Sequence, residues 1–398
     1  MASVLGLVKR IYTAFHPPAS ISTESQPIKF GILGAAAIAP PALIGPASNH
    51  PEAIVYAVAA RDEGRATAYA KKHGIPKVYG GANGYQELLN DPEVDAIYNP
   101  LPNGLHYEWT MKALAAGKHV LLEKPSADTA EETRLMFELA ERKGLVLLEA
   151  FHYRFHPAIQ RVKVIIDSGE LGAIKSIETN LAIPKGLIKD GDIRYDYSLG
   201  GGALMDMGCY TLNCIRYLSG SNPVEVLSAS YEGYKPPSAP LDFTPNVDRR
   251  TTATLSLPNN VIATLTCDLG IPYRYGIIPN MPQINAIVRC EGGDIELFNF
   301  VMPTLYHSIT VQSKDGTGGV KTRTEKVYKF AELQEPDMND EEWWTTYRYQ
   351  LEAFINKLKD RKPQTWLDKE DSVANIEWIE KIYAKGGLGS RPKSTYVP

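Results

Sequence analysis

Short apolar runs alternate with helix-like segments through the first 150 residues, and this alternation limits the possible fold more than any other feature of the sequence. Strands that alternate with helices in this way predict a doubly wound parallel sheet, an α/β fold. The expected strands are residues 28–33, 53–59, 94–98, 119–122 and 145–149, and the expected helices are residues 61–73, 106–116 and 129–142.

The second half of the chain has a different periodicity. From residue 223 onward, apolar residues recur with a period of two, which is typical of strands with one buried face. Hairpins are expected over residues 250–269 and 285–298. Together these strands predict an α+β domain with a large, mostly antiparallel open sheet, whose exposed face needs a cover. The other expected elements are a strand at 174–183 and helices at 159–168, 341–358 and 369–384.

The first apolar run ends in a turn of small residues. Gly34, Ala36 and Ala39 occupy the three positions of the dinucleotide pattern G-x-G-x-x-G/A, with alanine in place of the middle glycine. Small residues let backbone N–H groups approach a pyrophosphate; an alanine-rich helix start without a ligand is the alternative. We expect Gly34, Ala36, Ala37 and Ile38 to contact a dinucleotide in a Rossmann domain.

The tip of the second expected strand bears on the choice of cofactor. An acid at this position usually meets a free ribose 2′-OH, but here Arg61 follows Ala60, and Arg65 lies one helical turn further on. Two guanidinium groups suit a 2′-phosphate, so we expect NADP(H) in preference to NAD(H). Asp62 is the counter-evidence. It could cap a helix, or it could bind the ribose hydroxyl, and the second role would favour NAD(H).

Two further segments stand where parallel strands end, which is where such sheets bind ligands. Residues 99–104 form a proline-held loop, and the run 119–122 delivers Glu123 and Lys124 ahead of Pro125. Lys124 is either a fixed cation in the site or a lysine that points into water. The expected contacts on the nicotinamide side are Pro100, Leu101, Asn103, His106, Glu123 and Lys124.

A run of three glycines, residues 200–202, precedes a helical pattern that carries Asp206 and Tyr210. Four residues apart, they share one helix face, where a carboxylate and a phenol can address one small substrate. A purely structural pair is the alternative. Arg154 and Arg194 are candidates for the pocket wall, or for plain ion pairs with Asp192 or Asp196.

Composition excludes several classes of protein. A net charge of −4 and a pI near 6.1 argue against a nucleic-acid surface, and no run approaches the roughly 20 apolar residues of a membrane span. Four cysteines without CxxC spacing suggest thiols in a reducing compartment, the cytoplasm. His152 and His156 are four residues apart, but the aromatic residues around them favour a strand-to-helix corner over a metal site.

Residues 1–27 stand apart from the rest. Residues 4–15 could form an amphipathic helix with Lys9 and Arg10, and no acid appears before Glu24, a pattern that weakly resembles a transit peptide. An extension that packs on the protein's own surface, or on a partner subunit, is the other interpretation.

Four segments carry a family resemblance: Gly-Ile-Leu-Gly-Ala-Ala-Ala-Ile-Ala (31–39), Asn-Pro-Leu-Pro-Asn-Gly-Leu-His (99–106), Ala-Gly-Lys-His-Val-Leu-Leu-Glu-Lys-Pro (116–125) and Glu-Ala-Phe-His-Tyr-Arg-Phe-His-Pro (149–157). They resemble the glucose-fructose oxidoreductase and inositol dehydrogenase family, Gfo/Idh/MocA. Within it they are most similar to the branch of dimeric dihydrodiol dehydrogenases, NADP-dependent D-xylose dehydrogenases and glucose-fructose oxidoreductase. We expect an extension at 1–27, a Rossmann domain at 28–150 and a substrate-binding and oligomerisation domain at 151–398.

The resemblance also implies roles for individual residues. The family has an acid at the position of Asp206 and a proton-transferring residue four positions on, which is tyrosine in this branch and Tyr210 here. Lys124 would then stabilise the phenolate and bind a substrate hydroxyl, and Asp206 would orient the substrate. Another subunit usually covers the open sheet in this family, which implies a homodimer or homotetramer.

The implied reaction is hydride transfer between nicotinamide and a sugar or polyol. The substrate is an aldose oxidised at C1 to a lactone, or a keto or aldehyde sugar that is reduced; a trans-dihydrodiol is the other option. Sequence does not separate them, because loops such as 184–190 and 274–281 are expected to shape the pocket. The rivals are a non-catalytic NADP-binding regulator, a structural partner, and an enzyme that recycles bound cofactor between two sugars. Lys124, Asp206 and Tyr210 together favour an enzyme.

Overall fold

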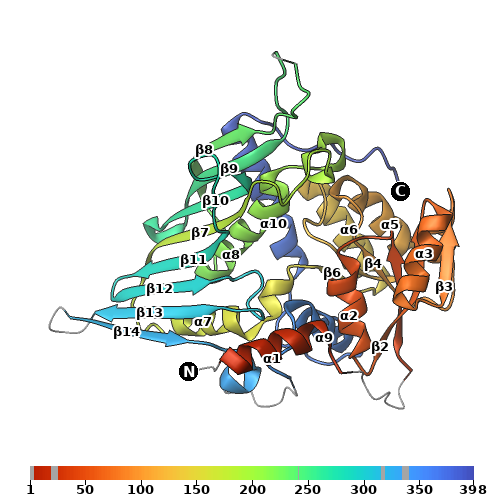
Figure 1. Ribbon diagram of the computed structural model, residues 1–398, viewed down its shortest axis with the longest axis horizontal. Coiled ribbons are helices and arrows are strands. Elements are labelled where there is room, and N and C mark those ends of the chain that lie inside the picture. Colours follow the sequence, from red (N-terminus) through yellow and green to blue (C-terminus); the bar gives the residue numbers. More distant parts are fainter. Residues whose placement is uncertain (1–3, 19–25, 241, 315–318, 334–339) are drawn as a thin grey trace.

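Two β-sheets with their covering helices make up the protein (Figure 1). The computed structural model describes residues 4–18, 26–240, 242–314, 319–333 and 340–398. One sheet is six-stranded and parallel, and the other is eight-stranded and mostly antiparallel. The predicted fold class, a doubly wound parallel sheet joined to a large open sheet, is therefore confirmed.

The parallel sheet has the strand order β3-β2-β1-β4-β5-β6. The order reverses between β1 and β4, so the carboxyl ends of these two strands border the crevice where ligands bind. All five expected strands are present, and β3 is an additional edge strand. The strands are β1 Ile28–Leu33, β2 Ala53–Ala60, β3 Lys77–Gly80, β4 Ala96–Asn99, β5 His119–Leu122 and β6 Leu147–Glu149.

The helices of this half follow the expected pattern except at the first crossover. There the small-residue turn leads into a π-helical turn, η1 Pro40–Ile44, and a single helical turn, α2 Gly45–Ser48. Pro40 and Pro41 have no N–H groups to bond to the carbonyls of Ala36 and Ala37, so a regular α-helix that starts in the alanine-rich turn cannot continue through them. The remaining helices are α3 Glu63–His73, α4 Gly84–Leu89, α5 His106–Ala115 and α6 Ala130–Lys143.

The eight-stranded sheet has the order β14-β13-β12-β11-β7-β10-β9-β8. Among its described strands β7 and β10 pair in parallel, and every other neighbouring pair is antiparallel. Both predicted hairpins, β9–β10 and β11–β12, are confirmed. The strands are β7 Ile174–Pro184, β8 Glu225–Gly233, β9 Asp248–Ser256, β10 Ile262–Ile271, β11 Gln283–Cys290, β12 Gly293–Phe298, β13 Ser308–Lys314 and β14 Val320–Glu325.

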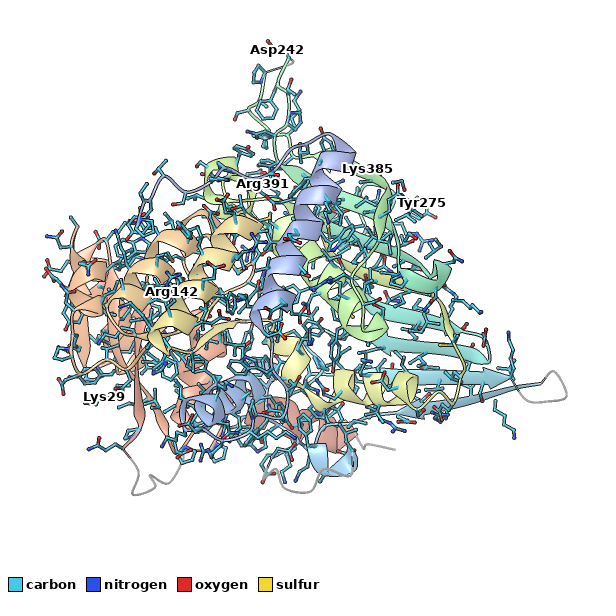
Figure 2. The ribbon with its side chains drawn as sticks, turned by 180° about the vertical axis from the view of Figure 1, so that it is seen from behind. Lys29, Arg142, Asp242, Tyr275, Lys385 and Arg391 are labelled. Carbon is cyan, nitrogen blue, oxygen red and sulfur yellow. The ribbon has the colours of Figure 1, made fainter. Side chains whose placement is uncertain are left out.

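Helices cover one face of this sheet. They are α7 Pro157–Asp167, α8 Cys209–Ser219 and α10 Lys369–Gly386, and strand residues that face them, such as Leu255, Leu265 and Val288, are buried. Residues on the other face, such as Thr264, stay partly exposed. Helix α10 also packs against α6, so it lies between the two halves of the protein (Figures 1 and 2).

The N-terminal helix, α1 Val4–Phe15, packs on the protein's own surface. Arg10 is only 5% exposed; its guanidinium donates to the Thr304 carbonyl (3.1 Å) and the Tyr328 hydroxyl (2.8 Å) and lies over the Tyr328 ring. The rest of the expected extension lies partly outside the described residues. Across the described residues, no helix is both long and apolar enough to cross a bilayer.

Candidate active site

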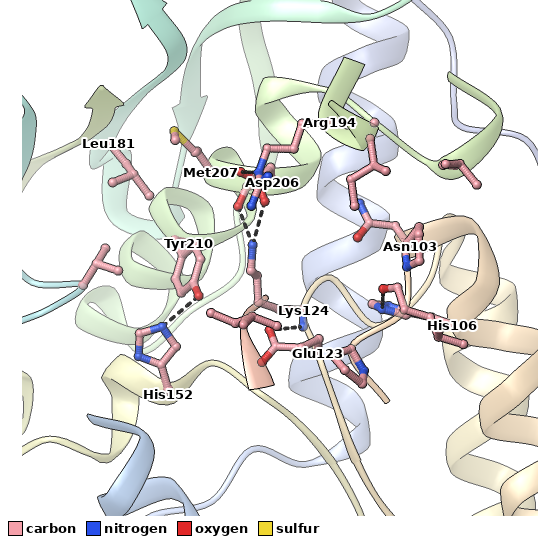
Figure 3. Close-up of a pocket in the computed structure, with 18 of the residues that line it drawn as sticks. Asn103, His106, Glu123, Lys124, His152, Leu181, Arg194, Asp206, Met207 and Tyr210 are labelled. Atoms are coloured by element: carbon pink, nitrogen blue, oxygen red, sulfur yellow. Dashed lines mark hydrogen bonds and ion pairs between the residues drawn. The ribbon is translucent and has the colours of Figure 1, made fainter. Parts of the chain in front are cut away.

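Lys124 of the first half meets Asp206 and Tyr210 of the second half (Figure 3). Lys124 follows the end of β5, Asp206 lies in a π-helical turn, η6 Leu204–Gly208, and Tyr210 lies in the first turn of α8. The Lys124 ammonium donates to a carboxylate oxygen of Asp206 (3.0 Å) and to its backbone carbonyl (2.8 Å), and lies 4.9 Å from the centre of the Tyr210 ring. The structure thus brings together the three residues that the sequence suggested as catalytic.

Asp206 is the centre of a small charge network. Its second carboxylate oxygen accepts from Arg194 Nε (2.9 Å), and Arg194 also pairs with Asp192 (3.0 Å), so this arginine both borders the site and forms one of the suggested ion pairs. Burial opposes the charge of Asp206, but Lys124 and Arg194 outweigh it and lower its pKa to about 2. Although burial opposes its charge too, Asp206 raises the pKa of Lys124. Both groups are therefore ionised at neutral pH.

The Tyr210 hydroxyl has a partner that the sequence analysis missed. It lies 2.9 Å from His152 Nε2, and both side chains are buried. Burial raises the pKa of Tyr210 well above its usual value, and burial, reinforced by the charge of Lys124, lowers the pKa of His152 to about 3. Both rings are therefore neutral in the free protein, and Lys124 contacts the face of the phenol rather than its oxygen.

His152 belongs to the corner between β6 and α7 that the sequence predicted. This corner is a 3-10 turn, η3 His152–Phe155, and His156 caps α7 by accepting a hydrogen bond from the backbone N–H of Ala158. The two histidines therefore serve different elements. The sequence could have pointed to His152 because it lies in the segment 149–157, which carries the family resemblance. The direction of the His152 side chain, however, depends on the 3-10 turn.

Loop residues of the first half close the side of the site that we expected to face the nicotinamide. His106 places its two ring nitrogens 2.8 Å from the Pro125 carbonyl and 2.7 Å from the Leu101 carbonyl, which ties the proline-held loop to the segment after Lys124. Asn103 donates to the Gly200 carbonyl (2.9 Å), so the loop also contacts the glycine run of the second half. Burial raises the pKa of Glu123, which accepts from the Tyr98 hydroxyl (2.7 Å).

These residues surround a cavity of about 310 Å³. Tyr347, Leu181, Val301 and Met302 add walls that the sequence analysis did not foresee. The sequence-derived candidates that line the cavity are Ile38, Pro100, Leu101, Asn103, His106, Glu123, Lys124, Arg194, Asp206 and Tyr210.

Two expectations about the pocket wall are wrong. Arg154 does not line this cavity; its side chain pairs with Asp371 of α10 (2.9 Å), because η3 turns it to the side opposite the site. The loops 184–190 and 274–281 do not line it either. They lie beyond the strand ends, where Leu187, Tyr275, Ile277 and Met281 are 66–80% exposed.

The small-residue turn fits a dinucleotide pyrophosphate. Gly34 has φ +86°, and a Cβ there would lie 3.2 Å from the Leu101 side chain, so a side chain would intrude on the turn. The backbone N–H groups of Ala36, Ala37 and Ile38 donate to no other group within the described part of the chain. They are free to bind an anion.

The β2 tip fits a 2′-phosphate. Asp62 caps α3 by accepting from the Arg65 backbone N–H (2.6 Å), which settles one of its two possible roles. Arg61 and Arg65 are exposed, and neither pairs with a carboxylate in the described residues; Arg65 donates to the Ala35 carbonyl (3.1 Å), beside the turn. Two cations thus lie at the strand end where Rossmann folds usually bind the adenosine ribose.

Comparison with known proteins identifies the family. Residues 28–151 match the model of the Gfo/Idh/MocA oxidoreductase family with an NAD-binding Rossmann fold, and residues 159–296 match the model of its C-terminal domain. The chain belongs to the Gfo/Idh/MocA oxidoreductase family.

Three similar proteins are informative. A D-xylose 1-dehydrogenase (NADP(+)) from Haloferax volcanii is 45% identical over 91% of this chain and 98% of its own length. A trans-1,2-dihydrobenzene-1,2-diol dehydrogenase from Sus scrofa is 34% identical over 56% of this chain and 62% of its own. The structure of KijD10, a 3-ketoreductase from Actinomadura kijaniata in complex with NADP and TDP-benzene, matches with a TM-score of 0.73 and 26% identity, covering 94% of this chain and 100% of that one.

The buried carboxyl of Glu149 makes the stability of the folded protein depend on pH. This fully buried carboxyl at the end of β6 accepts from the Ser126 N–H (2.8 Å), next to Pro125, and burial raises its pKa to about 8. Between pH 5 and 8 the unfolded chain releases this proton while the folded protein keeps it, so the folded state loses up to about 1.4 kcal/mol per pH unit as pH rises. We expect Glu149→Gln to remove this loss, so that the variant's free energy of unfolding rises relative to wild type from pH 5 to 8. A constant difference across urea titrations in that range would contradict this.

Proposed function

We propose that this protein is an NADP(H)-dependent sugar oxidoreductase. The observation that carries the proposal is the convergence of Lys124 from one half and Tyr210 from the other on a cavity that adjoins the dinucleotide turn. The substrate class is a sugar or polyol, with oxidation of an aldose at C1 to a lactone, or reduction of a keto or aldehyde sugar, as the reaction. The Haloferax relative supports both the cofactor and the sugar substrate.

The side chains suit acid–base work at a carbinol group. The bound nicotinamide supplies the hydride acceptor or donor. Two hydrogen bonds of the Lys124 ammonium go to Asp206, which leaves its third N–H for a substrate hydroxyl. Tyr210 exchanges the hydroxyl proton of the substrate, and the ion pairs of Asp206 hold Lys124 in place. Arg194 lines the same cavity and is a candidate for contacts to further substrate hydroxyls.

A trans-dihydrodiol of an aromatic ring is the second candidate substrate. The Sus scrofa relative is named for that reaction, and Ile38, Leu181, Val301 and Met302 give the cavity an apolar side that suits a carbocycle. An absorbance screen at the nicotinamide band separates the two candidates. It uses aldoses, uronic acids, anhydro sugars and a dihydrodiol, each with NADP⁺ and NAD⁺.

Tyr210→Phe tests the proton carrier. We expect turnover to fall by about 10²-fold or more, the usual size of general acid–base catalysis, because the ring stays while the hydroxyl is lost. NADPH affinity, measured by its fluorescence, stays close to wild type, since the proposed cofactor contacts lie elsewhere. Near-normal turnover in the variant would refute the assignment of Tyr210.

Arg61→Ala tests the choice of cofactor. Removing one guanidinium from the 2′-phosphate side is expected to weaken NADPH binding by about 1.5–3 kcal/mol, the size of a hydrogen bond to a charged group. NADH binding changes little, because NADH has no phosphate there. Equal losses for both cofactors in titrations of one preparation would show that Arg61 does not bind the phosphate.

We also propose a homodimer or homotetramer that forms through the open sheet. The uncovered face of β7, β10 and β9 carries small polar residues such as Thr264. Large apolar side chains project near its edge, each about 80% exposed: Tyr275 (Figure 2), Ile277 and Met281. Thr264→Arg places a charge in the middle of this face, so we expect it to reduce the mass found by sedimentation equilibrium. A wild-type protein that sediments as a monomer would exclude the interface.

We also propose that the chain divides into a Rossmann domain at 28–150 and a second domain at 151–398. The cytoplasm is the proposed compartment. All four cysteines are free thiols and buried, which suits a reducing environment. Cell fractionation that recovers the protein from an oxidising compartment would contradict the location.

A further inference from the structure

A second cavity lies behind the catalytic tyrosine. It measures about 390 Å³ and lies between α1, the π-helical turn η1 and the start of α9 Thr346–Leu358. Tyr347 and Met302 line both this cavity and the active-site cavity, so they form part of a common wall. Phe15, at the end of α1, lines the second cavity and is 67% exposed, which places one end of the cavity at the protein surface.

Two hydrogen bonds cross this wall. The Tyr210 hydroxyl lies 2.9 Å from His152 Nε2, and His152 Nδ1 lies 2.8 Å from the Thr346 hydroxyl. His152 lines the active-site cavity, and Thr346 lines the second cavity. Phenol, imidazole and hydroxyl thus form an unbroken line between the two spaces.

Among the described residues, the Tyr210 hydroxyl has no hydrogen-bond partner other than His152, so this line is the route that the structure offers for a proton that leaves Tyr210. Burial keeps Tyr210 protonated in the free protein, so its oxygen accepts the proton of a substrate alcohol only if its own proton leaves. Asp206 is a poor acceptor, since Lys124 and Arg194 hold its carboxylate ionised. A neutral imidazole accepts a proton on one nitrogen and releases one from the other.

We infer that His152 and Thr346 carry the proton of each turnover from Tyr210 to water in the second cavity. This inference rests on the proposed function. In the oxidative direction, the alcohol C–H bond breaks and its electron pair leaves as hydride to NADP⁺, while the alcohol proton forms a new O–H bond on Tyr210. The former Tyr210 proton moves to His152 Nε2, the Nδ1 proton moves to the Thr346 hydroxyl, and the Thr346 proton passes to water. Reduction reverses every step.

The surroundings of His152 favour transfer over storage of the proton. Tyr347 lies against the imidazole with 4.0 Å between ring centres and a tilt of 33° between the rings, and Tyr210 meets the imidazole edge to face. Lys124 is the charge that acts on this ring, and like burial it disfavours the imidazolium. His152 is a positioning residue in this scheme, because it acts on the substrate only through Tyr210.

Three variants separate a relay from a packing role. His152→Phe removes both nitrogens, and Thr346→Val removes one hydroxyl while keeping the shape. Thr304→Val is the matched control: Thr304 lines the same cavity, but its hydroxyl donates to the Trp344 carbonyl outside the line. NADPH fluorescence titration first confirms that each variant is folded and binds cofactor within about twofold of wild type.

The experiment is a single turnover that follows hydride and proton separately. Nicotinamide absorbance reports hydride transfer, and a pH-indicator dye in weakly buffered solution reports proton release. We expect hydride transfer and proton release to slow together, by about 10²-fold in His152→Phe, the lower end of the range for general acid–base catalysis, and by less, about 10-fold, in Thr346→Val, which loses only the last group of the line. Added imidazole buffer restores part of both rates, and Thr304→Val behaves as wild type.

The outcomes distinguish this inference from the proposed function. Wild-type rates in Thr346→Val would overturn the route, even if His152→Phe is slow, because His152 would then only orient Tyr210. Slow rates that imidazole leaves unchanged would overturn it as well. An inactive wild-type protein across the whole substrate panel would instead refute the proposed function.

Discussion

The ion pair between Lys124 and Asp206 joins the two halves of the protein at the place where both border one cavity. Withdrawing two charges from water is costly, so such a pair contributes little net stability, but loss of either partner leaves a buried charge unpaired. Its main effect is geometric. Because Arg194 holds the second oxygen of Asp206, the carboxylate cannot turn away, and Lys124 stays over the Tyr210 ring.

The sequence predicted the elements that have a clearly buried face and missed three of the four strands at sheet edges; the fourth, β6, is fully buried and was predicted. Strand β3 is half-buried throughout, and β8 and β14 are mostly exposed, so their side chains show little apolar alternation. All three are edge strands, where polar and charged residues also discourage pairing with other chains. The adjoining β13 alternates over only a few residues and was missed with them.

The sequence predicted which segments meet at the site wherever the topology of the parallel sheet alone determines their position. Parallel strands end at one edge, so the turn at Gly34, the proline-held loop and Lys124 had to meet. The direction of individual side chains was not predictable. Asp62 caps a helix, and a single 3-10 turn sends His152 toward Tyr210 but Arg154 toward Asp371.

Helix α10 and the segment after it span both halves of the protein. Glu380 accepts from the backbone N–H of Ala130 (3.3 Å), Lys369 pairs with Glu141 (2.9 Å), and the Ser394 N–H binds Glu132 (2.6 Å). A hinge that swung one half away from the other would break all three contacts. The C-terminal segment therefore opposes hinge motion between the two halves, so we expect the width of the crevice between them to stay nearly constant as reactants enter and leave.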